Sequence, residues 1–255
     1  MHSHRRNRTR LRLRKIIYLA GSILLGSSIS LSAQTDDNAI TPELTRLGKQ
    51  LYTANCAICH GPDGMGDGVL ANEFVPRPRN FTIGNFKFNS SEIGEPPTRA
   101  DLIKTIERGI EGSSGRSMPA FTDFTSSEKI ALAEIIRQFA EFDAYGAPFD
   151  IPRKPRRTDR RKGRALYTSL GCVACHGETG QGDGELASGL EDENSEPIQP
   201  ANFVSGKLKG GSNATDIWLR IYGGVNGTPM PSFGQNVSAS DIWQLAFYIE
   251  SIAKN

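Results

Sequence analysis

Two Cys-x-x-Cys-His pentapeptides, Cys56–His60 and Cys172–His176, contain all four cysteines of this 255-residue chain. This spacing is typical of covalent attachment of c-type haem. The two thiols of each motif add across the two vinyl groups of one haem, and the adjoining imidazole lies where it can bind the iron. The predicted attachment residues are Cys56, Cys59, Cys172 and Cys175, and the predicted iron ligands are His60 and His176.

A zinc site and a thiol–disulfide redox pair are the alternative interpretations of these motifs. A redox pair does not need the histidine in the fifth position. A zinc ion bound by two cysteines and one histidine of a single motif would lack a fourth ligand close by. Two complete motifs with no remaining cysteine therefore favour two covalently bound haem c groups.

The second axial ligand of each iron cannot be a histidine of the mature chain. The only other histidines are His2 and His4, which belong to the extreme N-terminal leader. The distal ligand must then be methionine, lysine, a terminal amine, water or nothing.

Methionine is the favoured distal ligand because two methionines occur in the same tetrapeptide, Met-Pro-x-Phe. Met118 and Met230 lie at similar distances after their Cys-x-x-Cys-His motifs, and we predict that each binds the iron of its own half. The alternative is that a methionine only fills a gap in the core. Met65 is too close to the first motif to reach the opposite face of the same ring, and we expect it to pack in its loop.

The two halves of the chain form a tandem repeat with an offset of 112 to 122 residues. A repeat of about 115 residues has the size of a small domain rather than of a solenoid unit. The matched segments are Leu51-Tyr52-Thr53 with Leu166-Tyr167-Thr168, Cys59–Ala71 with Cys175–Ala187, Asn80-Phe81 with Asn202-Phe203, and Asp101–Gly112 with Asp216–Gly227.

Capping residues and apolar spacing predict helices in each half, separated by loops rich in glycine and proline with no alternating strand pattern. Gly48 and Gly163 lie inside the first helices, where glycine costs about 1 kcal/mol, so we expect close helix packing there. The predicted starts are Thr41-Pro42 and Asp159 for the first helices, Thr98 and Thr215 for short helices ending at Gly109 and Gly223-Gly224, and Ser127 and Ser238 or Ser240 for the last helices, which run to about Phe142 and Ala253.

With these motifs in place, each half resembles a class I cytochrome c, and the whole chain resembles a di-haem member of that family over about residues 41–145 and 158–255. The resemblance implies an all-α fold of two tandem cytochrome c-like domains, each a small helical bundle around a covalently bound haem. It also implies that the first and last helices cross beside the Cys-x-x-Cys-His loop and that the methionine approaches from the far side of the ring.

The family often places a glycine and an aromatic residue at this helix crossing. The first helices match with Gly48/Tyr52 and Gly163/Tyr167, and the last helix of the second half matches with Tyr248. The sequence alignment places Ile136 opposite Tyr248 in the first half, a departure from the pattern, and we expect Phe139 to supply the bulk there.

The N-terminus has the pattern of a secretory signal peptide. Residues 1–15 carry seven basic residues and no acid, an apolar run follows, and the predicted cleavage point is after Ala33. An uncleaved membrane anchor is the alternative, since the apolar run is short. The predicted organisation is a signal peptide over 1–33, a first cytochrome c domain over 34–148, a basic linker over 149–164 and a second domain over 165–255, exported to the periplasm.

Removing residues 1–33 changes the formal net charge from +2 to −5. The linker 149–164 carries eight basic and two acidic residues between two acidic domains. One interpretation is a solvated connector held against acidic faces, and the other is a docking strip for an acidic partner or for anionic lipid headgroups. Nucleic acid is excluded as a partner by the compartment and by the lack of interleaved aromatic residues.

The second half also carries six extra residues around Glu191–Glu196. The expectation is an exposed acidic loop, with a calcium site as the alternative.

These observations predict an exported di-haem cytochrome that relays electrons between periplasmic or membrane redox partners, such as other proteins of a respiratory chain or a periplasmic oxidoreductase. An iron bound by histidine and methionine is six-coordinate, so no position is open for a substrate. The alternative is a haem-containing subunit or enzyme of an oxidoreductase complex. A di-haem peroxidase would need a further histidine and a thiosulfate-oxidising site an unusual ligand such as cysteine, and the mature chain offers neither.

Overall fold

The computed structural model describes residues 40–92, 94–111 and 116–253, and the predicted signal peptide lies outside them. Eight α-helices and four 3-10 helices form the described part of the chain, which contains isolated β-bridges but no strand. No helix among these residues is long and apolar enough to cross a membrane. We call residues 40–148 the first half and residues 160–253 the second half.

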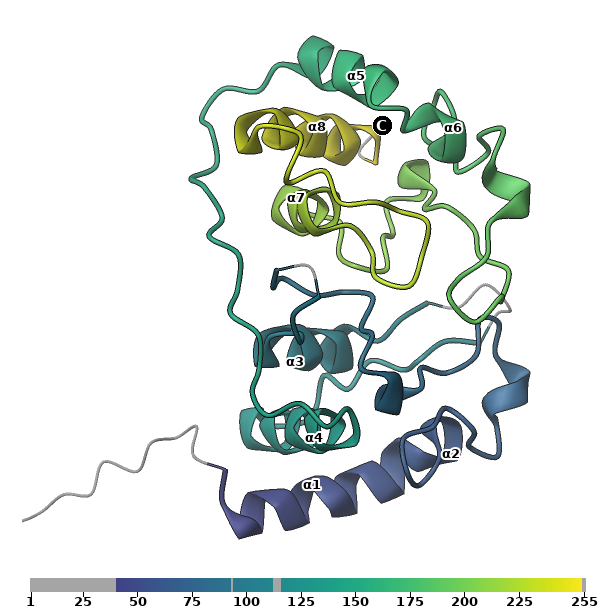
Figure 1. The fold of residues 1–255 in the computed structure, drawn as a ribbon, viewed down its shortest axis with the longest axis vertical. Helices are drawn as coiled ribbons and strands as arrows, with labels where there is room; N and C mark the ends of the chain where they lie inside the picture. The colour runs from purple at the N-terminus through teal and green to yellow at the C-terminus, as the bar shows by residue number, and fades with distance from the viewer. Residues whose placement is uncertain (1–39, 93, 112–115, 254–255) are drawn as a thin grey trace, which may run out of the picture. The chain divides into compact units, whose positions relative to one another are not determined.

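The two halves have the same order of elements (Figure 1). The first half contains α1 (Pro42–Asn55), α2 (Ala57–His60), η1 (Ala71–Glu73), η2 (Phe81–Ile83), α3 (Arg99–Arg108) and α4 (Ser126–Phe139). The second half follows with α5 (Arg160–Ser169), α6 (Val173–His176), η3 (Ala187–Gly189), η4 (Phe203–Ser205), α7 (Ala214–Gly223) and α8 (Ala239–Ile252), so that α5 begins within the predicted linker.

Side-chain caps explain where the helices begin. The Thr41 hydroxyl accepts a hydrogen bond from the amide of Leu44 at the start of α1, and Asp159 caps α5, as the sequence predicts. Thr98 and Ser238 cap α3 and α8, again as predicted. The helices α4 and α7 begin one residue earlier than predicted, because Thr125 and Asn213 cap them.

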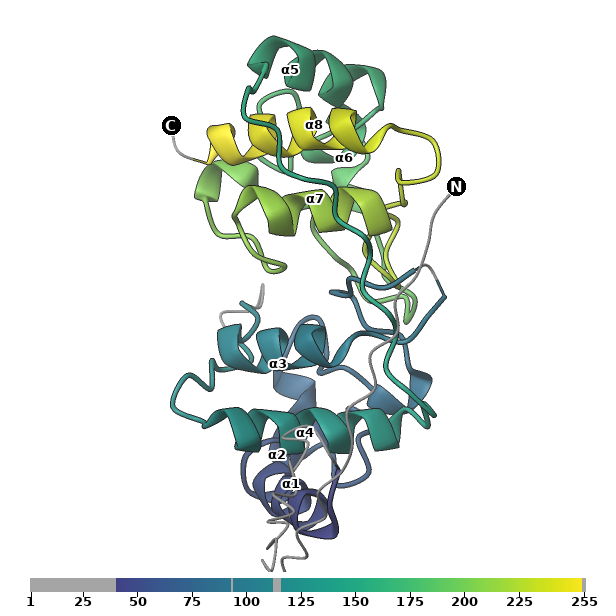
Figure 2. The same ribbon diagram turned by 90° about the vertical axis from the view of Figure 1, so that its left-hand side faces the viewer.

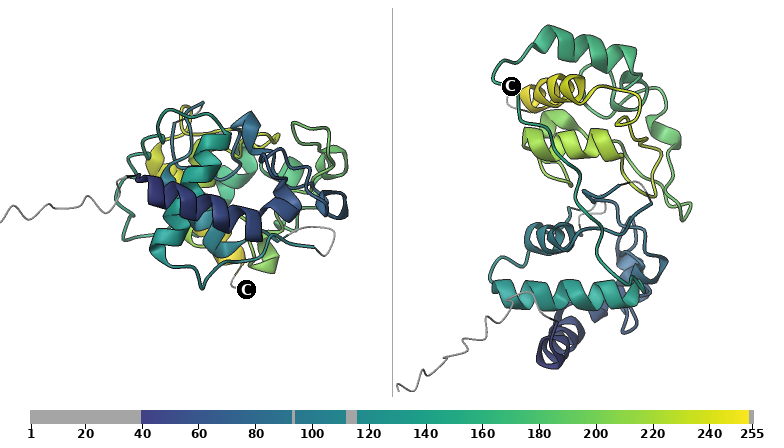
Figure 3. Two further views of the ribbon diagram at one scale, coloured as in Figure 1. Left: turned by 90° about the horizontal axis from the view of Figure 1, so that it is seen from below. Right: turned by 60° about the vertical axis from the view of Figure 1, so that its left-hand side comes forward.

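The first and last helices of each half cross at a glycine, and Figure 3 shows α1 crossing α4. A β-carbon at Gly48 would overlap the carbonyl oxygen of Ala131, and one at Gly163 would overlap that of Gln244, so only glycine allows this approach. The expected close packing is therefore confirmed.

The residue opposite Tyr248 in the first half is Ile135, which corrects the alignment by one position. Ile135 packs against Gly48 as Tyr248 packs against Gly163, because the caps of α4 and α8 differ by 113 positions. Phe139 supplies the missing aromatic ring, as expected, with its centroid 4.9 Å from that of Tyr52.

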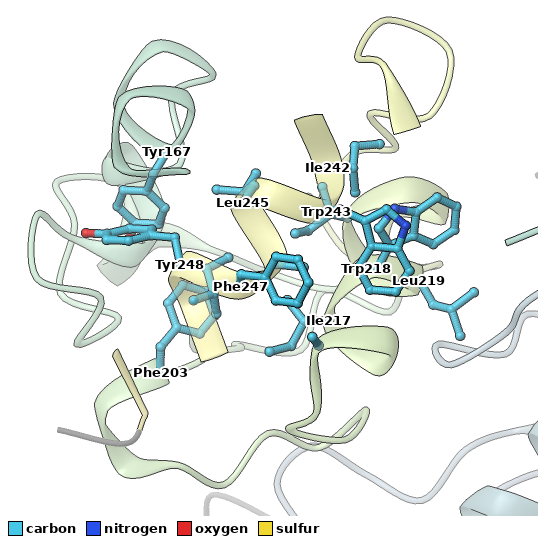
Figure 4. Close-up of a cluster of buried hydrophobic side chains, with 14 of the residues drawn as sticks. Tyr167, Phe203, Ile217, Trp218, Leu219, Ile242, Trp243, Leu245, Phe247 and Tyr248 are labelled. Carbon is cyan, nitrogen blue, oxygen red and sulfur yellow. The ribbon is translucent and has the colours of Figure 1, made fainter. Parts of the chain in front are cut away.

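Each half has its own apolar core. In the second half the core contains the indoles of Trp218 and Trp243 between α7 and α8, with ring centroids 5.7 Å apart (Figure 4). The first half buries aliphatic side chains of α3 and α4 around Phe81 and Phe86. Burial along α4 and α8 is wider than the single stripe that the sequence indicates.

The chain between α4 and α5 has no helix and runs along the second half (Figure 2). Trp243 Nε1 donates to the carbonyl oxygen of Pro152 at 3.1 Å, and the ammonium of Lys154 lies 5.0 Å from the ring centroid of Phe247. Packing against α8 therefore positions this segment.

Charged side chains of the two halves pair directly. Asp216 on α7 accepts hydrogen bonds from Lys104 and from Arg108 of α3, the latter at 2.7 Å. The inserted loop 191–196 also takes part, because Asp192 pairs with Lys87 at 3.1 Å and Glu193 pairs with Arg79. These pairs orient the two halves.

The inserted loop is thus only partly the exposed acidic loop that the sequence predicts. Asp192 is 9% exposed, and its carboxylate also accepts the amide hydrogens of Asn194 and Glu196. Burial acts to raise the pKa of Asp192, but these hydrogen bonds and Lys87 outweigh it and hold the pKa below its ordinary value. The described residues contain no group of three acidic, histidine or cysteine side chains that could hold a metal ion.

Candidate functional site

Each Cys-x-x-Cys-His motif lies on a four-residue helix that directly follows the first helix of its half. In α2 the amide of His60 donates to the carbonyl oxygen of Cys56 at 2.9 Å, and in α6 His176 donates to Cys172 at the same distance. The following residues, Gly61 and Gly177, have φ values of 77°, which glycine adopts without strain. The turn presents the histidine next to its two cysteines.

Both histidine rings are oriented by a backbone carbonyl. Nδ1 of His60 lies 2.9 Å from the carbonyl oxygen of Arg79, and Nδ1 of His176 lies 3.1 Å from that of Ala201. A carbonyl only accepts hydrogen bonds, so Nδ1 carries the proton and Nε2 keeps its lone pair. This is the arrangement in which an imidazole binds a metal.

A phenylalanine stacks on each histidine ring. Phe81 lies 4.5 Å from His60, and Phe203 lies 4.5 Å from His176, measured between ring centroids. Burial lowers the pKa of both imidazoles, which keeps them neutral. A neutral imidazole is the form that coordinates iron.

A buried tyrosine fastens the glycine that follows each motif. The hydroxyl of Tyr52 donates to the carbonyl oxygen of Gly61, and that of Tyr167 donates to the carbonyl oxygen of Gly177, both at 2.7 Å. Each tyrosine therefore connects the first helix to the loop after the motif.

The cysteines do not have the properties of a redox pair. None of the four forms a disulfide, and burial raises the pKa of Cys56 and of Cys172 to about 11. A reactive redox thiol needs a lowered pKa. The zinc alternative also fails, since no group of three potential metal ligands exists among the described residues.

The methionine segments of the two halves share one backbone hydrogen bond, in which the methionine carbonyl oxygen is the acceptor. Met118 exchanges two amide–carbonyl hydrogen bonds with Ile110, of 2.9 and 3.0 Å, and Val225 donates to the carbonyl oxygen of Met230 at 3.2 Å. Gly109 and Gly224 lie against these segments where a β-carbon would collide. Met65, which we expected to pack in its loop, is 53% exposed, so that expectation is wrong.

In the second half the predicted site residues line one cavity of about 810 Å³. Its walls include apolar side chains of α7 and α8, and its volume suits a large planar cofactor. The predicted residues among its lining are Cys172, Cys175, His176 and Met230.

This donor set fits a c-type haem. Two adjacent thiols, an imidazole with a free Nε2 and a thioether in an apolar cavity are the groups that attach and ligate haem c. The group supplies one-electron redox chemistry, whereas the protein orients the imidazole and excludes water.

Three kinds of site residue were not assigned roles from the sequence. The stacking phenylalanines and the tethering tyrosines carried a signal, because both occur at matched positions of the repeat. Gly68 and Gly184 also occur at matched positions, and a β-carbon at either would overlap a carbonyl oxygen of the preceding short helix. Their amides donate to Cys59 and Cys175 at 3.1 Å, so both loops are closely packed.

Two family models match the chain. The model described as cytochrome c matches residues 161–253, and the model described as cytochrome c oxidase, cbb3-type, subunit III matches residues 43–135. Each match covers most of one of the two halves.

Curated relatives with similar sequences are subunits of cbb3-type cytochrome c oxidases. The CcoP subunit of Azospirillum sp. (strain B510) is 28% identical over 214 residues, which cover 80% of this chain and 61% of CcoP. The FixP subunit of Azorhizobium caulinodans is 28% identical, covering 85% of this chain and 64% of FixP. The chain therefore spans less than two thirds of the length of these relatives.

One solved structure is similar to this protein over almost the full length of the solved chain. A chain of the Kuenenia stuttgartiensis reducing HAO-like protein complex Kustc0457/Kustc0458 is 36% identical with a TM-score of 0.75, and the match covers 84% of this chain and 97% of that chain. Together with the two family matches, this places the protein: it belongs to the di-haem class I cytochromes c, electron-transfer proteins with two all-α cytochrome c domains and two covalently bound haem c groups.

Proposed function

We propose that this protein is an exported electron-transfer subunit that relays single electrons through two haems, each ligated by histidine and methionine. The ligand pairs are His60 with Met118 and His176 with Met230. The observation that carries the proposal is the common cavity of His176, Met230 and the two cysteines of the second motif. The backbone hydrogen bond that Met118 and Met230 share extends it to the first half.

The ligand set explains the choice of electron transfer over catalysis. An iron with both axial positions filled by protein side chains changes its surroundings little between oxidation states. The apolar lining and the thioether both favour the reduced state, so we expect relatively high potentials for both haems.

We further infer that the protein works in a complex at the periplasmic side of a membrane. The relatives named above are subunits of a cbb3-type oxidase and of an HAO-like complex, which supports a partner that is itself a redox enzyme. The leader over residues 1–33 supports export. The proposal does not extend the full activity of CcoP and FixP to this protein, because the chain matches only part of their length.

The ligands are tested by replacing one methionine at a time. In Met230→Ala the second iron should bind carbon monoxide, while the first stays closed, and Met118→Ala should show the reverse. The measurement is the visible spectrum of the reduced protein before and after carbon monoxide, together with the methionine–iron charge-transfer band of the oxidised protein. Carbon monoxide binding by the unmodified protein, or no change in Met230→Ala, would contradict the assignment.

A further inference from the structure

The cavity of the second half is completed by side chains of the first half. Besides the second motif and Met230, its lining includes Lys87, Phe88 and Glu111. A haem bound in this cavity would therefore lie close to residues of the first half.

Cations predominate among the charged side chains of this lining. The lining contains four lysine or arginine residues but one acidic residue, Glu111. The four basic residues are Lys87, Lys207, Lys209 and Arg220. Buried cations are costly unless an anion or hydrogen-bond acceptors compensate them. The lining thus has more positive charge than its own acids neutralise.

Arg220 is the clearest case of a cation in this lining that no acidic side chain of the described part of the chain neutralises. Its Nε atom is buried and has no hydrogen-bond partner among the described residues, while one terminal nitrogen donates to the carbonyl oxygen of Asn89. Burial lowers the pKa of Arg220 to about 10, although the carboxylates of Asp101 and Asp216 act in the opposite direction. Nε is enclosed by protein atoms, and within the described residues no carboxylate forms an ion pair with this guanidinium, so a carboxylate in the cavity would compensate its charge through the terminal nitrogens.

Lys209 also lines the cavity and forms no ion pair within the described residues, but it is exposed to solvent and so carries no buried, uncompensated charge. Lys87 and Lys209 follow Phe81 and Phe203 by six residues, so they are equivalent positions of the two halves. The two halves thus bring equivalent lysines to one place.

A haem attached through its vinyl groups keeps two propionate carboxylates as its only anionic substituents. We propose that Arg220 and Lys209 bind the propionates of the second haem, while Lys87 of the first domain, which is held by Asp192, adds positive charge nearby. A guanidinium matches a carboxylate with two parallel hydrogen bonds, and ammonium groups add charge. This inference rests on the haem occupying the cavity, as the proposed function does, but not on ligation by Met230.

The first haem lacks the same arginine. Thr105 follows Asp101 by four residues, as Arg220 follows Asp216, and the Thr105 hydroxyl donates to the carbonyl oxygen of Asp101. This cation is therefore particular to the second half, where it would raise the midpoint potential of the second haem relative to a site without it.

The test is a spectroelectrochemical titration of the full chain with both haems, in Arg220→Gln and in Lys209→Gln. Loss of a cation leaves a propionate unpaired, and its charge stabilises the oxidised iron, so the midpoint potential of the second haem should fall and that of the first should stay. A variant lacking Cys172 and Cys175 identifies the wave of the first haem. Arg220→Lys should retain most of the original potential.

Lys104→Gln is the matched control, because Lys104 pairs with Asp216 between the halves and does not line the cavity. Both waves of this variant should match those of the unmodified protein. The proposal is overturned if Arg220→Gln and Lys209→Gln behave like Lys104→Gln while mass spectrometry shows two bound haems. A mass that shows no second haem in the unmodified protein would instead overturn the haem assignment itself.

Discussion

The histidine of each motif is positioned by a small set of neighbours that recurs in both halves. A carbonyl orients Nδ1, a phenylalanine stacks on the ring, and a tyrosine fastens the next glycine. These contacts surround the imidazole on the side away from the iron. They restrict its rotation before and after electron transfer, which keeps the rearrangement small.

A substitution at Tyr167 measures how much the tyrosine hydrogen bond contributes to the stability of the second motif. Tyr167→Phe removes the hydroxyl that donates to Gly177 and leaves the Gly177 carbonyl with only the longer hydrogen bond from the amide of Gly180, at 3.3 Å. We expect a loss of about 1–2 kcal/mol in the free energy of unfolding. Trp218 and Trp243 are the only tryptophans of the chain, so their fluorescence during urea unfolding reports on the second half alone.

Tyr222→Phe is the control for this change, because no hydrogen bond of the Tyr222 hydroxyl is present among the described contacts, although its ring packs on Trp218. Its unfolding midpoint should stay close to that of the unmodified protein. Equal stability of Tyr167→Phe and Tyr222→Phe would mean that the bond to Gly177 does not support the second motif.

Residues whose roles follow from covalent attachment or from the neighbouring sequence were predictable from the sequence. The cysteines and histidines followed from motif spacing, and Thr41 and Asp159 followed from capping preferences. The orientation of His60 by the carbonyl of Arg79, 19 positions away, depends on the folded loop and has no local signal. Arg220 was missed for the same reason, since its burial arises only where the two halves meet.

The crossing of α5 and α8 determines where the second motif begins. Gly163 allows the two helices to approach so closely that Tyr248 packs on its backbone and on Tyr167. The sequence indicated this contact because it places a glycine, which lowers helix stability, inside the predicted helix. It did not give the register in the first half, where Ile135 rather than Ile136 takes the equivalent place, because apolar residues occupy both positions of α4.

Gly163→Ala tests this crossing. The added methyl group would overlap the carbonyl oxygen of Gln244, so α5 and α8 must separate. Overpacking of this kind costs about 1–3 kcal/mol, which outweighs the gain in helix propensity of about 1 kcal/mol. Thermal unfolding monitored by circular dichroism should show a lower midpoint.

Gly189→Ala provides the comparison, since nothing lies within 4 Å of a β-carbon at Gly189. Its midpoint should be unchanged or slightly raised. If Gly163→Ala were as stable as Gly189→Ala, close contact between α5 and α8 would not be needed for the fold.

At the scale of the whole chain, charge is distributed unevenly along the sequence. The segment 149–164 is strongly basic between two acidic halves. Its arginines 156, 157, 160 and 161 are exposed, whereas Lys162 pairs with Asp241 at 2.5 Å. Contacts of Pro152 and Lys154 with α8 already hold the connector, so these four arginines are not needed for that role.

The exposed arginines should therefore attract anionic redox partners. Replacing Arg156, Arg157, Arg160 and Arg161 by glutamine removes four positive charges without touching either core. The rate at which ferricyanide, a trivalent anion, oxidises the reduced protein should fall several-fold at an ionic strength of about 0.01 M, where the Debye length is about 30 Å. At about 1 M salt, where that length is about 3 Å, the variant and the unmodified protein should react equally fast in stopped-flow measurements. If the variant and the unmodified protein reacted equally fast at both ionic strengths, the basic segment would be a connector alone. A difference in rate that persists at high salt would point to altered haem potentials rather than to electrostatic attraction.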